Sequence, residues 1–141
     1  MNKILFIACF CLLVMVSCEN KYSYIEIVKD KGVQSGKYTD IEKEPETIKA
    51  ENDSLAYIQA FRKFCVAVYV NEVRYKASNT RYIIPIDFKL LNSNKEDVKE
   101  KYFGNRKDIE EAIFDMIPLT ELDGQKLTID EFKDAVYNRL Y

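Results

Sequence analysis

The chain begins with a basic residue, Lys3, and an unbroken run of thirteen apolar residues from Ile4 to Val16. A helix that crosses a membrane needs about 20 apolar residues, because it must span about 30 Å of hydrocarbon. Thirteen residues instead match the apolar core of a secretory signal peptide, which is about 7–15 residues long. The run therefore predicts an export signal that contributes nothing to the folded domain.

The apolar run ends in the motif Met15-Val16-Ser17-Cys18, and polar Glu19 follows at once. This segment resembles the lipobox of bacterial lipoproteins, in which a small residue precedes an obligatory cysteine. The family favours leucine three positions before the cysteine, where this chain has Met15. The resemblance implies diacylglyceryl transfer to Cys18, cleavage before Cys18 by signal peptidase II, and acylation of the new N-terminus by a fatty acid such as palmitate.

Two other cysteines fit the lipobox less well. Only five apolar residues precede Cys9, and Cys11 follows Phe10, which is too bulky for the position before the cleavage site. A type I signal peptide cleaved near Ser17 and an uncleaved membrane anchor are the alternative interpretations of the segment.

The lipobox interpretation divides the chain into three parts. We expect a lipoprotein signal peptide at 1–17, a lipidated N-terminus with a short tether at 18–21, and a single domain at 22–141. It also predicts a protein exported to the periplasm or cell surface of a Gram-negative envelope and anchored by lipid in the cell membrane or outer membrane. The sequence does not decide between the two membranes.

Three segments of the mature chain have the pattern of β-strands. Residues 22–29 alternate in polarity and are rich in β-branched and aromatic residues, and residues 37–41 follow a glycine-containing turn. Residues 81–91 are also rich in such residues but contain Pro85, which has no N–H to donate, so this strand is expected at an edge or at a bulge.

Three further segments have helical patterns. The first begins at Asn52 or Asp53 and continues to about Val73, with Leu55, Ile58, Phe61, Cys65 and Val68 on one face. Its run 66–70 is rich in β-branched residues and fits a buried strand as well, so that alternative stays open. Together with the strands, these patterns predict an α+β fold with a few antiparallel strands and about three helices.

The second and third helices lie near the end of the chain. The second follows Gly104-Asn105, places Ile109, Ile113 and Met116 in register, and ends at Pro118. The third begins with Thr128 and Glu131, which form a capping box, and Leu127 with Phe132 is positioned to form a hydrophobic staple. Phe132, Val136 and Leu140 (or Ala135) form its predicted buried stripe.

Composition argues against several functions. There are 21 basic and 23 acidic residues, a net charge of −2, whereas a nucleic-acid binder usually has a basic excess. The chain contains no His, so the commonest general base and metal ligand are both missing. Cys65, the second cysteine of the mature chain, has no His to activate it and is expected to be a small core residue. We therefore expect no enzyme activity, no cofactor and no bound metal.

Two acidic features have simple structural explanations. The segment 122–132 looks like an EF-hand, but placing Gly124 at the sixth loop position puts Leu119 at the first position, where calcium needs an oxygen ligand. The capping box explains the same residues without a metal. Adjacent acids such as Glu110-Glu111 are expected to form a solvated helix face.

Tyrosine is the remaining unusual feature, because all ten Tyr residues lie after the predicted leader. Tyr22 and Tyr24 share one face of the first strand, and Tyr137 and Tyr141 share one face of the last helix. They either complete a small core that has no Trp, or form a recognition surface, since Tyr is enriched at interfaces.

The sequence thus favours a lipid-anchored envelope protein whose domain binds an envelope protein partner without catalysing a reaction. Binding of a glycan or another small ligand is one alternative, and a role as an inhibitor or immunity lipoprotein is another. A cleft lined by Tyr would favour a small ligand, and an extended apolar patch would favour a protein partner.

Overall fold

The computed structural model describes residues 18–32, 35–81, 83–102 and 106–141. The predicted signal peptide, with the lipobox residues before Cys18, and Gly104-Asn105 lie outside these described residues. No helix within the described residues is both long enough and apolar enough to cross a membrane.

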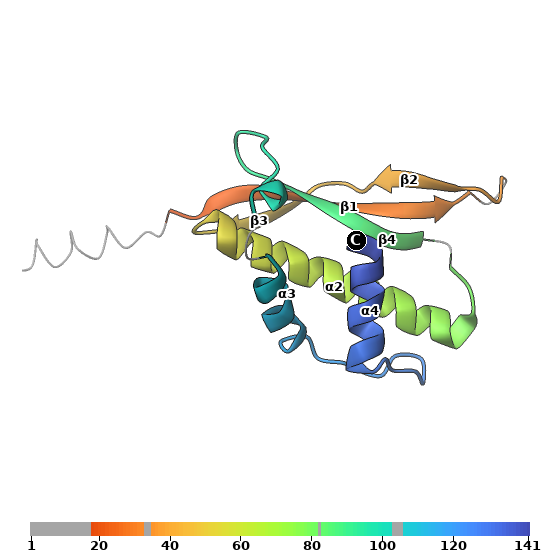
Figure 1. The fold of residues 1–141 in the computed structure, drawn as a ribbon. Helices are drawn as coiled ribbons and strands as arrows, with labels where there is room; N and C mark the ends of the chain where they lie inside the picture. The colour runs from red at the N-terminus through yellow and green to blue at the C-terminus, as the bar shows by residue number, and fades with distance from the viewer. Residues whose placement is uncertain (1–17, 33–34, 82, 103–105) are drawn as a thin grey trace, which may run out of the picture.

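The described residues form one small α+β domain, as the sequence predicts, with its helices gathered on one side of an antiparallel sheet (Figure 1). In chain order the elements are β1 (Asn20–Lys31), β2 (Tyr38–Glu42), β3 (Glu46–Ala50), α2 (Asp53–Ser78), β4 (Ile83–Leu91), η1 (Lys99–Tyr102), α3 (Arg106–Phe114) and α4 (Ile129–Leu140).

Strand β1 is the centre of the sheet. Residues 27–31 of β1 pair with β2, and residues 20–24 pair with β3, so these two short strands succeed one another along the same edge of β1. The opposite edge of β1 pairs with β4 through residues 23–30. The predicted strands are confirmed, whereas β3 has no counterpart among the predicted elements, because only Ile48 and Ala50 of its five residues are buried.

Pro85 lies where its missing N–H predicts, on the edge strand β4 and beside a bulge. Ile27 pairs with Asp87 and the next residue, Val28, pairs with Pro85, so Ile86 is an extra residue in β4. Such a bulge interrupts the ladder at the position where proline could not have donated a hydrogen bond.

Helix α2 is longer than predicted and settles the ambiguity at 66–70 in favour of a helix. It begins at Asp53 after the N-cap Asn52, whose side chain accepts a hydrogen bond from the Leu55 N–H at 2.9 Å. It ends at Asn79, which adopts a left-handed conformation with φ of 53°. Packing against the sheet outweighs the weak β-preference of the valines, since Val68 is fully buried. Leu55 is an error in the predicted buried face, because this first-turn residue is 41% exposed.

The last helix matches its prediction closely. Thr128 accepts a hydrogen bond from the Glu131 N–H at 3.2 Å, and the Glu131 carboxylate accepts one from the Thr128 N–H at 2.8 Å, which completes the capping box. Phe132 and Val136 are buried, and Leu140 packs against the core. In the preceding region, Met116 is half exposed and lies beyond the end of α3, so its predicted place in the core is taken by Ile117.

Asp123 and Gly124 form a tight turn that explains the resemblance of this segment to an EF-hand. Both residues have positive φ angles, 52° and 73°, and Leu122 and Gln125 exchange two backbone hydrogen bonds across them. An Asp-Gly pair is favoured in such a two-residue turn because both central residues need positive φ. The backbone therefore reverses within two residues, where an EF-hand needs a twelve-residue loop.

The core, which lies between α2 and the sheet and among the helices, is largely aromatic. The Phe64 and Phe88 rings lie 5.5 Å apart between their centroids, and Phe114 meets Phe132 edge to face at 5.4 Å. Cys65 is fully buried among these residues, as expected for a small core side chain, and burial followed by the nearby Glu110 raises the pKa of its thiol. The thiol is thereby kept protonated and out of contact with solvent.

Candidate functional site

The four tyrosines assigned to a possible recognition surface do not lie together on one. Tyr22 and Tyr24 are 3% and 1% exposed because α2 packs against their face of β1, so they complete the core, as the alternative prediction had it, and do not form an exposed recognition surface. The edge of Tyr24 nevertheless borders the groove described below. Tyr137 is half buried and Tyr141 is exposed, with their ring centroids 6.0 Å apart. Only the last two remain accessible, at the end of α4.

Tyr137 and Tyr141 instead belong to a cluster of tyrosines and carboxylates that joins the three helices. Tyr57 donates to the Glu110 carboxylate at 2.6 Å, and Tyr141 donates to its other oxygen at 3.3 Å. Tyr137 donates to Glu111 at 2.9 Å. Glu110 is fully buried, so the expectation of a solvated face is wrong for this residue, whereas the side chain of Glu111 is 43% exposed. These bonds hold α2, α3 and α4 together, which gives the cluster a structural role.

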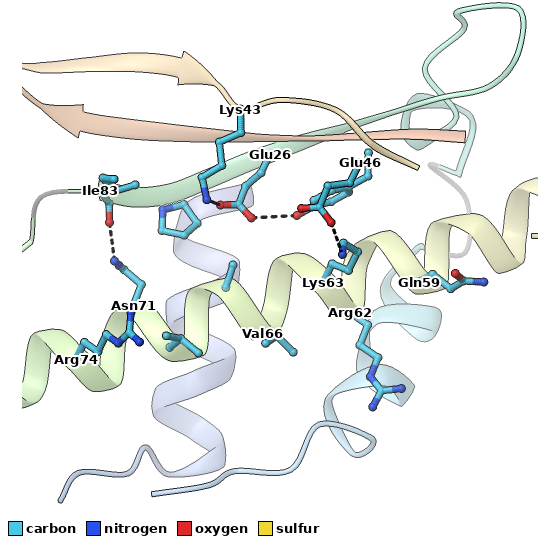
Figure 2. A pocket seen from close by; sticks show the side chains of 14 residues that line it. Glu26, Lys43, Glu46, Gln59, Arg62, Lys63, Val66, Asn71, Arg74 and Ile83 are labelled. Carbon is cyan, nitrogen blue, oxygen red and sulfur yellow. Dashed lines mark hydrogen bonds and ion pairs between the residues drawn. The ribbon is translucent and has the colours of Figure 1, made fainter. Parts of the chain in front are cut away.

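A groove of about 660 Å³, open to solvent, lies between the sheet and one side of α2 (Figure 2). We call it the α2 groove. Side chains from β1, from the segment around β3, from α2 and from the start of β4 line it; they are Tyr24, Glu26, Lys43, Glu46, Gln59, Arg62, Lys63, Val66, Ala67, Val70, Asn71, Arg74, Ile83 and Pro85.

Two ion pairs lie within the α2 groove. The Lys43 ammonium is 2.6 Å from the Glu26 carboxylate, and the Lys63 ammonium is 2.7 Å from that of Glu46. Figure 2 shows these four side chains converging between the strands and the helix. Glu26 is largely buried, and the hydroxyl of Tyr24 lies 3.4 Å from it; burial and this carboxylate raise the Tyr24 pKa, so the phenol stays neutral. The Lys63–Glu46 pair is exposed on both sides and therefore easily exchanged for other partners.

The α2 groove has a surplus of positive charge. Four basic and two acidic side chains line it, whereas the whole chain has a net charge of −2. The surplus lies in Arg62 and Arg74, whose guanidinium groups have no ion-pair partner in the part of the chain that the structure describes. Arg62 projects from α2 away from the sheet and so lies on the outer margin of the groove (Figure 2).

Apolar side chains lie between these charges. Val66 on α2 is 43% exposed and Ile83 at the start of β4 is 47% exposed, and both line the groove beside Val70 and Pro85. At the same end, the side chain of Asn71 donates to the Ile83 carbonyl oxygen at 2.6 Å and so ties α2 to β4. The groove therefore combines a fixed apolar floor with a basic margin.

Among the described residues that line the α2 groove there is no Ser, Thr or Cys, and both carboxylates of the lining are ion-paired with lysines. Among the described residues, no group of three or more His, Cys, Asp or Glu side chains is arranged to hold a metal ion. Comparisons with models of protein families, with curated proteins and with solved structures found no match to this chain.

Apart from Tyr24, the residues of the α2 groove were not singled out by sequence reasoning, although the sequence contains a signal for them. The segment 64–70 is apolar almost throughout, and a helix with such a segment cannot turn every residue toward the core. Phe64, Cys65 and Val68 are buried, and Val66 is consequently left on the surface. The uninterrupted apolar run that made 66–70 resemble a strand therefore also indicated that part of this helix would be apolar and exposed.

Proposed function

We propose that this protein is a lipid-anchored, non-catalytic module of the cell envelope that binds an acidic, partly apolar segment of a protein partner in the α2 groove. The observation that carries the proposal is the surplus of positive charge at Arg62 and Arg74 around exposed Val66, on a chain that is negatively charged overall. Complementary charge guides encounter and fixes the register of a bound segment, while apolar contacts supply affinity.

The anchor part of the proposal rests on the lipobox-like sequence and on the position of Cys18. Cys18 is exposed and precedes β1 by a single residue, Glu19, so an attached lipid would hold the sheet close to the membrane surface. Metabolic labelling with a palmitate analogue tests it. Cys18→Ser is expected to abolish the label, whereas Cys9→Ser and Cys11→Ser are expected to retain it; equal labelling of all three variants would contradict the anchor.

The groove part of the proposal is tested with synthetic peptides and the full chain in detergent. A fluorescent peptide of alternating Glu and Val is expected to bind, and its affinity should fall as salt is added, because exposed charges are screened. Arg74→Glu should weaken binding by about tenfold or more, since one favourable contact becomes a repulsion. The same substitution at Lys37, which lies outside the groove, is the matched control. Equal binding of an alternating Lys and Val peptide would contradict the proposal.

A crosslinking experiment in cells tests the same site with the native partner. Val66 and Leu55 are both apolar residues of α2 with similar exposure, 43% and 41%, but only Val66 lines the groove. A photo-reactive amino acid at position 66 is expected to crosslink a partner peptide rich in Asp and Glu, and one at position 55 is not. Crosslinking of the same peptide from both positions would place the partner elsewhere.

A further inference from the structure

A second hollow of about 660 Å³ lies at the C-terminal end of β1 and shares no lining residue with the α2 groove. We call it the basic pocket. Lys29 and Lys31 come from β1, Tyr38 from β2, Tyr75 from the last turns of α2, and Arg81 from the segment that leads to β4. The lining thus comes from two stretches of the chain, 29–38 and 75–84, that only the fold brings together.

The basic pocket carries three positive charges, and no carboxylate lines it in the described part of the chain. Within the same residues, neither Lys29 nor Lys31 has an ion-pair partner, and the Lys31 ammonium lies 6.0 Å from the centre of the Tyr38 ring. The nearby carboxyl end of α2 contributes about half a negative charge, which is small against three cations. The pocket is therefore a region of positive potential, suited to an anion.

Arg81 is held rigidly in the wall of this pocket. Its guanidinium lies 3.9 Å above the centre of the Tyr75 ring and 2.7 Å from the Glu72 carboxylate, while its carbonyl oxygen accepts a hydrogen bond from the Tyr38 hydroxyl at 3.2 Å. Glu72 is shared with Arg139, so one carboxylate serves two guanidinium groups and the cluster stays net positive. The buried Nε of Arg81 has no hydrogen-bond acceptor in the described residues, which leaves a donor unsatisfied.

The other side chains that line the basic pocket indicate which class of anion it could bind. Tyr38, which is 45% exposed, presents an aromatic ring, whereas one face of the Tyr75 ring is covered by Arg81. Asn79 and Thr80 present an amide and a hydroxyl. Sugar rings pack against aromatic side chains through their apolar C–H faces, while amides and hydroxyls satisfy their hydroxyl groups. We propose that the basic pocket binds a small acidic sugar, carboxylated or phosphorylated, whose oxyanion contacts Lys29, Lys31 and Arg81.

The position of the pocket favours a ligand free in the envelope over a lipid headgroup. The twelve residues of β1 span about 40 Å at about 3.3 Å per residue, and the pocket lies at the end of β1 opposite Cys18. If Cys18 carries lipid, as proposed above, the pocket lies at the end of β1 farthest from that lipid. The binding of an acidic sugar itself does not depend on the anchor or on the α2 groove.

Calorimetric titration of the full chain in detergent tests the inference with five probes. Glucuronate and glucose 6-phosphate should bind, neutral glucose should not, and inorganic phosphate and glycerol 3-phosphate should bind more weakly because they have no ring. Preferential binding of glycerol 3-phosphate would indicate a lipid headgroup and overturn the assignment. Equal binding of glucose would also overturn it, because the cations would then play no part.

Charge-reversal variants locate the binding. Lys29→Glu and Lys31→Glu should each weaken binding of glucuronate by about tenfold or more. The matched control Lys37→Glu reverses an exposed lysine of the same hairpin that does not line the pocket, and Arg74→Glu alters only the α2 groove. Both controls should bind as the unaltered protein does. Thermal unfolding of each variant verifies that it is folded, and unchanged binding in folded Lys29→Glu and Lys31→Glu would refute the pocket.

Discussion

The two sides of α2 face different environments and are stabilised in different ways. One side is packed into the aromatic core, where Phe61, Phe64 and Val68 are fully buried. The other side forms the α2 groove, where Val66 is 43% exposed and the Lys63–Glu46 pair is open to solvent. The comparison teaches that the packed side of the helix determines the stability of the domain, whereas the groove side contributes little to stability and is free to serve binding.

The largest effect is expected from a cavity on the packed side. Phe64→Ala removes a fully buried ring that lies 5.5 Å from the Phe88 ring, and should lower the free energy of unfolding by about 3–5 kcal/mol. Val66→Ala, two residues away on the groove side, should change it by less than about 0.5 kcal/mol. Denaturant unfolding of both variants measures the contrast, and similar losses would show that the two sides of α2 are not energetically distinct.

A smaller effect is expected from the buried polar bond on the packed side. Tyr57→Phe deletes the hydroxyl that donates to fully buried Glu110 at 2.6 Å, and should cost about 1–3 kcal/mol because the carboxylate loses a donor that water cannot replace. Tyr141→Phe removes the longer bond to the same carboxylate from a residue that is 75% exposed, and should cost less. Equal losses in the two variants, measured by denaturant unfolding, would contradict this ranking.

The burial of Cys65 predicts a loss of stability in alkaline solution. Burial raises the pKa of its thiol above the ordinary value of 9.0. Below pH 9 the thiol is protonated in both states, so its contribution to the free energy of unfolding is fully present. As the pH rises above 9, the thiol ionises in the unfolded chain but not in the folded one, and this contribution is lost. The contribution is up to about 1.4 kcal/mol per pH unit above 9. Between pH 8 and 10, the free energy of unfolding of Cys65→Ala should decline less steeply than that of the unaltered protein. Parallel declines in denaturant unfolding would contradict a contribution from Cys65.

The smallest effect is expected in the α2 groove. Lys63→Ala breaks the exposed pair with Glu46 and should change the free energy of unfolding by less than about 1 kcal/mol, because solvent already screens both charges. The same variant should nevertheless weaken binding of the acidic peptide. A large loss of stability, detected by denaturant unfolding, would show that the groove is a structural element of the domain.

Local patterns predicted much of the fold. The α+β class and the capping box at Thr128 were predicted correctly. So were the N-cap, given as Asn52 or Asp53 and found at Asn52, and the place of Pro85 at an edge or a bulge, because each depends on a few adjacent residues. The missed strand β3 carries few apolar residues, and its pairing partner β1 lies more than twenty residues earlier in the chain. The formation of β3 depends on its hydrogen bonds with the distant strand β1, and a local sequence pattern does not predict such pairing.

The candidate sites could not be predicted from local sequence patterns, because they too depend on contacts between distant segments. The α2 groove and the basic pocket bring together side chains from segments up to about sixty residues apart. The net charge of each site depends on which oppositely charged side chains lie close enough to pair. Tyr22 and Tyr24 illustrate the converse, because their shared strand face was predicted correctly but the helix that covers it was not. At Tyr22 and Tyr24, local periodicity therefore predicted which side chains share a face of the strand but not whether that face is buried.

By itself, the amino-acid sequence determined the types of most elements, their caps and turns, and the absence of His chemistry, because these properties depend on residue identity and on neighbours within a few positions. Only the tertiary structure decided which tyrosines and carboxylates are buried and which cations remain without a partner. These properties arise from contacts between distant segments, and the free energy of such contacts is set by packing and desolvation in the folded state.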